Sequence, residues 1–88
     1  MDTDTRAAYI DAALTLSAYQ REQERRRNAA AWRAITWTES ARMASGLRTW
    51  HRCSRLAEVA REAALEHDAN QRDAWADRCA LVDAVEAG

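Results

Sequence analysis

The chain has 88 residues and a net charge of −1, with 13 basic residues, all of them Arg, against 14 acidic ones. This length allows one domain, residues 1–88, and the near-zero charge argues against a protein that coats nucleic acid with its whole surface. Hydrophobic residues make up 48% of the chain, but half of them are alanine, and no run approaches the roughly 18–20 apolar residues that cross a membrane.

The composition predicts an all-α protein. Proline is absent, glycine occurs only at Gly46 and Gly88, and strong helix formers dominate. The scarcity of β-branched residues argues against a β-rich fold, and the lack of clustered glycines excludes a P-loop or a Rossmann turn. The acidic start lacks the basic and apolar regions of a secretory signal, so we expect a cytoplasmic protein. Abundant Ala and Arg without Lys are typical of GC-rich genomes, so we expect a bacterial or phage source.

The first helix is expected over residues 4–44. Residues 2–5 offer Asp and Thr side chains as N-caps, and two apolar rows at helical spacing follow them. The segment Gln20–Asn28 contains no apolar residue. Because Glu22 precedes Arg26 by one helical turn, we favour one continuous helix over a new helix that starts at Asn28.

Two further helices are expected after a break at Ser45 and Gly46, with Gly46 in the left-handed conformation that ends many helices. The second helix, 47–67, carries a heptad seam of Trp50, Cys53, Ala57, Ala60, Ala64 and His67. A turn is expected over Asp68–Asp73, with Asn70 as the cap of a third helix over 71–86. Residues 36–39 have the form of a competing capping box, which the lack of nearby turn formers disfavours.

The predicted fold is therefore a helical hairpin or three-helix bundle with one long N-terminal helix. The first helix would be roughly 60 Å long and the second roughly 30 Å, so the shorter helices would cover about half of the long one. The rest of its apolar stripe would then face water, and an exposed stripe of that size marks an interface. We therefore expect the chain to bind itself as a homo-oligomer, or to bind another protein.

Seven residues are the candidates for partner binding. Trp32 and Trp37 are separated by about 140° around a helix, so both cannot face one core, and one of them is expected to anchor a partner. The predicted function is a small non-enzymatic protein-interaction module, an adaptor, inhibitor or regulator, that acts by helix-on-helix docking. The candidate set is Tyr9, Ile10, Leu14, Leu16, Tyr19, Trp32 and Trp37.

The alternative function is a nucleic-acid-binding regulator. On a helix, Arg48, Arg52 and Arg55 share one face, which is the form of a phosphate-binding stripe. Residues 21–61 carry a net charge of +6, whereas residues 1–20 carry −2 and residues 62–88 carry −5. We expect the basic and acidic regions to pack as antiparallel neighbours and to neutralise each other.

Enzymatic, metal and cofactor roles have little support. His51 and His67 are sixteen residues apart and would lie more than roughly 20 Å apart on one helix, so they cannot share a metal ion within one chain. Cys53 and Cys79 are expected to face each other across an antiparallel pair with an offset of roughly 9 Å, as free thiols rather than a disulfide. No nucleophile and base stand in a recognisable arrangement, so we expect no catalysis, cofactor or metal.

Overall fold

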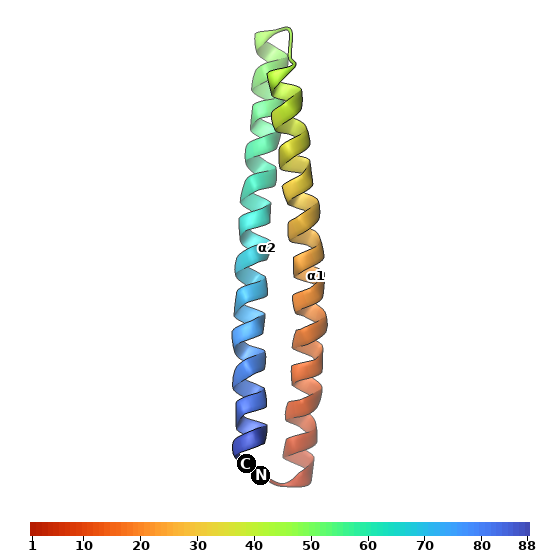
Figure 1. Cartoon of the computed structure of the whole chain (residues 1–88), viewed down its shortest axis with the longest axis vertical. Coiled ribbons are helices and arrows are strands. Elements are labelled where there is room, and N and C mark those ends of the chain that lie inside the picture. Colours follow the sequence, from red (N-terminus) through yellow and green to blue (C-terminus); the bar gives the residue numbers. More distant parts are fainter.

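The computed structural model describes all 88 residues as two long antiparallel helices (Figure 1). Helix α1 covers Thr3–Arg42 and helix α2 covers Leu47–Ala87. Their Cα atoms span 66 × 13 × 13 Å. The two chain ends meet opposite the turn, where the amino group of Met1 donates to the carbonyl oxygen of Gly88 at 3.5 Å. The predicted all-α helical hairpin is confirmed, and the three-helix alternative is wrong.

Helix α1 begins at an Asp cap and runs without interruption. The backbone N–H of Thr5 donates to Oδ1 of Asp2 at 2.7 Å, and this bond lowers the pKa of Asp2 because it favours the ionised carboxylate. Glu22 accepts hydrogen bonds from Arg25 and Arg26 within the polar segment. The predicted continuity through Gln20–Asn28 is confirmed, so Asn28 caps no new helix.

The break near Gly46 is confirmed, but its conformation is not the predicted one. Met43 ends α1, and its backbone N–H bonds the carbonyl oxygen of Glu39 at 3.1 Å. Gly46 has φ −139° and ψ 154°, an extended conformation, and precedes the first residue of α2. The left-handed prediction is therefore wrong, because Gly46 serves as an N-terminal cap residue of α2. The competing helix start at residues 36–39 is absent, since the Thr36 hydroxyl bonds the Trp32 carbonyl within α1.

Helix α2 continues through Asp68–Asp73, where a turn was expected. The predicted boundaries 47–67 and 71–86 are therefore wrong. Three polar side chains of this segment bond across to α1 instead of capping a new helix. Asp68 accepts from Arg27 at 3.1 Å, Asn70 donates to Gln23 at 3.4 Å, and Gln71 accepts from Arg27 at 2.9 Å. No residue in the segment is glycine or proline, so these contacts with α1 decide between helix and turn.

The two helices meet along a seam of small side chains. Seven of the eight buried residues are alanine or cysteine, and Ala30 is completely buried. Small residues let the helix backbones approach closely, and the heptad spacing of the seam is that of a coiled coil. On α1 the seam consists of Tyr9, Ala13, Leu16, Gln20, Gln23, Arg27, Ala30, Ala34, Trp37, Ala41 and Ala44. On α2 it consists of Cys53, Ala57, Ala60, Ala64, His67, Gln71, Ala74, Arg78, Leu81 and Val85. Trp50, predicted as the first residue of this seam, is instead 46% exposed, because it lies beyond the end of the buried contact.

A polar layer interrupts the seam near its middle. Buried Gln23 lies with its Oε1 atom 2.7 Å from Nδ1 of His67. One turn further along, Arg27 donates to Asp68 at 3.1 Å and to Gln71 at 2.9 Å. A shift of one helix against the other would leave these half-buried groups without partners, so the layer specifies the register of the hairpin.

The helices match in length, with 40 residues in α1 and 41 in α2. The prediction that half of α1 lacks an intramolecular partner is therefore wrong. Neither helix contains a stretch that is long, apolar and uncharged enough to cross a bilayer.

Candidate functional site

The three main hollows of the protein open between the two helices. The turn-side groove has a volume of about 680 Å³, the central hollow about 340 Å³ and the end groove about 430 Å³. Arg27 and Asp68 line both the turn-side groove and the central hollow, so these two are continuous. The turn-side groove is lined by Arg27, Ala31, Ala34, Ile35, Thr38, Glu39, Arg61, Ala64, Leu65 and Asp68.

The heptad repeat places all three hollows on one side of the hairpin. Ile35 of the turn-side groove lies 21 residues, or three heptads, after Leu14 of the end groove. On α2, Val82 of the end groove likewise lies three heptads after Arg61 of the turn-side groove. Because the seam keeps its heptad spacing throughout, equivalent positions face the same way. We call this side, which carries the residues that line the three hollows, the open face.

The open face carries a large share of the exposed apolar surface. Thirteen large apolar residues are exposed, and six of them line the three hollows. Leu14 and Leu65 are 65% and 71% exposed on the rims of their grooves. Apolar groups that gather on one side of a small protein mark an interaction surface. The six residues are Ile10, Leu14, Ile35, Leu65, Trp75 and Val82.

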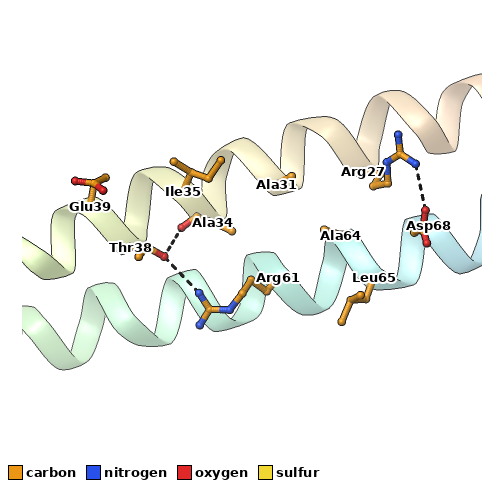
Figure 2. A pocket seen from close by; sticks show the side chains of 10 residues that line it. All are labelled: Arg27, Ala31, Ala34, Ile35, Thr38, Glu39, Arg61, Ala64, Leu65 and Asp68. Atoms are coloured by element: carbon orange, nitrogen blue, oxygen red, sulfur yellow. Dashed lines mark hydrogen bonds and ion pairs between the residues drawn. The ribbon is translucent and has the colours of Figure 1, made fainter.

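Figure 2 shows how the turn-side groove is built. Ile35 lies along the outer edge of α1 and Leu65 along the outer edge of α2, with Ala34 and Ala64 between them. The Thr38 hydroxyl donates to the Ala34 carbonyl at 2.7 Å and accepts from Arg61 at 3.3 Å. The groove therefore has a floor of small side chains between two apolar rims. This shape suits the apolar side chains of another helix.

The seven residues predicted to bind a partner are divided among three environments. Tyr9, Leu16 and Trp37 occupy seam positions and are half-buried between the two helices. Ile10 and Leu14 line the end groove of the open face, and the seam residue Tyr9 lines it as well. Tyr19 and Trp32 are 45% and 69% exposed and line none of the three hollows. The structure therefore does not bring these seven residues together on one surface.

Four apolar residues of the open face were missing from the prediction. Ile35 continues the row of Leu14 at heptad spacing, so the spacing within α1 carried a signal for it. Leu65, Trp75 and Val82 belong to α2, and their place beside α1 depends on the continuity of α2 through Asp68–Asp73. Extending the heptad seam of His67 to Gln71 and Ala74 would have indicated that continuity.

The hairpin has a basic half and an acidic half. Residues 24–67, on the turn side, carry nine Arg and five acidic residues, a net charge of +4. Residues 1–23 and 68–88, on the side of the chain ends, carry four Arg and nine acidic residues, a net charge of −5. The expected neutralisation between basic and acidic regions is therefore largely absent, because the fold pairs basic segments with each other. Among the ion pairs, only that of Arg27 with Asp68 joins the two helices.

The three arginines of the alternative prediction lie near the turn, on the side of α2 opposite the seam. All three are exposed. Arg55 forms an ion pair with Glu58 at 3.7 Å, whereas Arg48 and Arg52 form none. The two unpaired guanidinium groups lie in the basic half of the hairpin and are accessible to an anion.

The remaining reactive side chains do not converge. Cys53 and Cys79 are free thiols that lie 26 residues apart on α2, so the expectation that they face each other across two helices is wrong. No group of three or more His, Cys, Asp or Glu residues gathers in a geometry suited to a metal ion. His67 belongs to the polar layer, whereas His51 stacks edge-on against Trp50, with ring centroids 4.9 Å apart.

Comparison of the chain with protein-family models, with curated proteins and with solved structures finds no match.

Proposed function

We propose that this protein is a small non-enzymatic interaction module, an adaptor, inhibitor or regulator, that binds an amphipathic helix on its open face. The observation that carries the proposal is the gathering of Ile10, Leu14, Ile35, Leu65, Trp75 and Val82 along three aligned hollows of one side. A helix that places apolar side chains at i, i+3 or i+4, and i+7 presents the matching stripe.

The geometry of the hairpin favours this mode of binding. A two-helix hairpin has only one internal contact surface, and seven of the eight residues buried in it are alanine or cysteine. Large apolar side chains such as Ile35, Leu65 and Trp75 remain outside, where a third or fourth helix would remove them from water. Burial of a leucine or isoleucine side chain contributes about 1.5–3 kcal/mol. Ile35 and Leu65, on the two rims of the turn-side groove, are therefore the expected anchors.

Site-specific photo-crosslinking in the native host tests the proposal. A photoreactive amino acid at position 35 is expected to form a covalent adduct with a protein, because Ile35 lies on the rim of the groove. The matched control carries the same amino acid at position 32, where Trp32 is more exposed than Ile35 but lines no hollow. Adducts at position 32 with none at position 35, or no adduct at either, would contradict the proposal.

We propose that the protein acts in the cytoplasm. Cys53 and Cys79 lie 26 residues apart on α2 and have no partner thiol within the chain, and free thiols of this kind persist in a reducing compartment.

A second candidate function, a nucleic-acid-binding regulator, has one observation in its favour. Arg48 and Arg52 are exposed, lack ion pairs and lie in the half of the hairpin with a net charge of +4. Gel shifts at low and moderate salt test it, since phosphate contacts weaken steeply as salt rises. Loss of binding in Arg48→Ala/Arg52→Ala, with binding retained in a double variant of Arg25 and Arg26, would support this function. The latter two arginines are already paired with Glu22.

A further inference from the structure

The charge of the hairpin is distributed along its length in a way that suits a second copy of the same chain. The turn-side half carries +4 and the half with the chain ends carries −5. Two copies that lie side by side in the same direction would place like charges together. Two copies in opposite directions bring the basic half of each chain alongside the acidic half of the other, and this long-range attraction favours that orientation and speeds association. The charged residues that line the hollows nearly balance at both ends, with Arg27 and Arg61 against Glu39 and Asp68 in the turn-side groove and Arg6 and Arg78 against Glu86 in the end groove.

The apolar residues of the open face suit the same arrangement. Leu14 and Ile35 lie ten and eleven residues on either side of Glu24 on α1. On α2, Leu65 and Trp75 each lie five residues from Asn70. Glu24 on α1 and Asn70 on α2 lie at the same height along the hairpin, because Gln23, next to Glu24, accepts a hydrogen bond from Asn70 at 3.4 Å.

A two-fold axis across the hairpin at this level relates the two copies. The two open faces are stacked on each other, and the axis lies in the plane between them and points from α1 to α2. This symmetry packs α1 against α1 of the second copy, and α2 against α2 of the second copy. Leu14 then lies opposite Ile35 of the second copy, and Leu65 lies opposite Trp75 of the second copy. The open face is thus self-complementary, as an interface with two-fold symmetry requires.

The available area is sufficient for a stable dimer. One long side of the hairpin measures 66 Å by 13 Å between Cα extremes, or about 860 Å². Standard protein interfaces bury about 800 Å² per partner. The open face therefore offers a full-sized interface without any rearrangement of the hairpin.

We propose that the occupant of the open face is a second copy of this chain, bound antiparallel to form a four-helix bundle. This inference rests on the proposed helix-docking function and names its partner. The result is a closed dimer in which the three hollows of each copy are covered by the other copy.

Sedimentation of the purified protein tests the stoichiometry. The expected mass is twice the 9.9 kDa of the chain. Ile35→Glu/Leu65→Glu is expected to shift the protein to 9.9 kDa, because four carboxylates would be buried in the interface. Trp32→Glu is the matched control, outside the open face, and is expected to remain a dimer. Circular dichroism of each variant checks that the helices persist, and a further variant, Leu14→Asp, replaces the double variant if that one unfolds.

A spin label in the turn tests the orientation. With Cys53→Ala and Cys79→Ser as background, Ser45→Cys carries one label per chain at an exposed site. In the antiparallel dimer the two labels lie at opposite ends, at a separation close to the 66 Å length of the hairpin. A parallel dimer would place them within about 20 Å of each other, about two interhelical spacings.

Three outcomes would overturn the proposal. These are a monomer at all accessible concentrations, a dimer with the short label distance, and a dimer that tolerates glutamate on the open face but not at position 32. A monomer whose position 35 still crosslinks to another protein would refute the dimer while leaving the helix-docking function intact. Loss of that crosslink as well would refute both.

Discussion

A proline at position 69 tests whether α2 runs through Asp68–Asp73. Ala69 is exposed and lies in the middle of this segment, so its replacement removes no side-chain contact. In a continuous helix, proline at this position removes the hydrogen bond from the N–H of residue 69 to the carbonyl of Leu65, and its ring clashes with that carbonyl. In a turn, the same proline would be tolerated.

The expected loss is large for a chain of this size. Proline in a helix interior costs about 3 kcal/mol or more, whereas glycine at the same position costs about 1 kcal/mol. For a domain of 60–100 residues, 1 kcal/mol corresponds to a change of about 4–8 °C in Tm. Ala69→Pro should therefore lower Tm by roughly 12–24 °C, and Ala69→Gly by roughly 4–8 °C. The proline value is a minimum, because a kink would also displace the cross-helix bonds of Asp68 and Asn70.

Thermal melts followed by far-UV circular dichroism measure both variants against the wild type. The glycine variant controls for lost helix propensity at the same site, so the difference between the variants reports the broken hydrogen bond and the clash. If Ala69→Pro had the same Tm as Ala69→Gly or as the wild type, the segment Asp68–Asp73 would not be helical, and the two-helix description would be refuted.

Three further variants test the ion pairs of the polar segment, the polar layer and the seam. Glu22 has a pKa of about 2, below its ordinary value of 4.5, mainly because Arg25 and Arg26 hydrogen-bond its carboxylate. The bonds from Arg25 and Arg26 to the Glu22 carboxylate stabilise the folded protein fully above pH 4.5, and this stabilisation is lost as pH falls toward 2. Thermal melts across that range should therefore show the Tm advantage of wild type over Glu22→Gln shrinking. A Tm difference that stays constant would contradict this pKa assignment. Gln23→Ala removes a buried partner of His67 and should lower the free energy of unfolding in urea by about 1–3 kcal/mol. The control is Gln20→Ala, which should cost less because the side chain of Gln20 forms no hydrogen bond. Equal losses in the two variants would argue against the polar layer. Ala30→Leu adds volume at a completely buried seam position and should lower the free energy of unfolding by about 1–3 kcal/mol. The control, Ala29→Leu at an exposed position, should stay within about 0.5 kcal/mol of wild type. A stabilised Ala30→Leu variant would show that the helices can move apart.

Local features of the chain were predictable where one helix determines them. Asp2 caps α1 because its side chain reaches an N–H three residues away, and this needs no other helix. The polar segment around Glu22 stays helical through contacts with its own next turn. The break at Gly46 follows from the only glycine in the interior of the chain.

Features that depend on both helices were harder to predict. Asp68 and Asn70 have the side chains of a turn, yet they are helical because Arg27 and Gln23 on α1 bond them. On α1, two neighbouring rows of apolar residues compete for the interface. The structure places Tyr9 and Leu16 in the seam and leaves Ile10 and Leu14 beside it.

The sequence by itself determined that this protein is helical, that the chain turns at Gly46 and that the small residues from Cys53 to Ala64 form a heptad seam on the second helix. These properties depend on propensity, capping and spacing, all of which act within a few residues. Only the tertiary structure decided that α2 is continuous, that the two helices match in length, and that Ile35 and Leu65 form the two rims of one groove. It also decided that basic segments lie beside basic segments, since a hairpin pairs residues by their distance from the turn. The physical reason is the same in each case, because contacts between residues far apart in the chain outweighed weak local preferences.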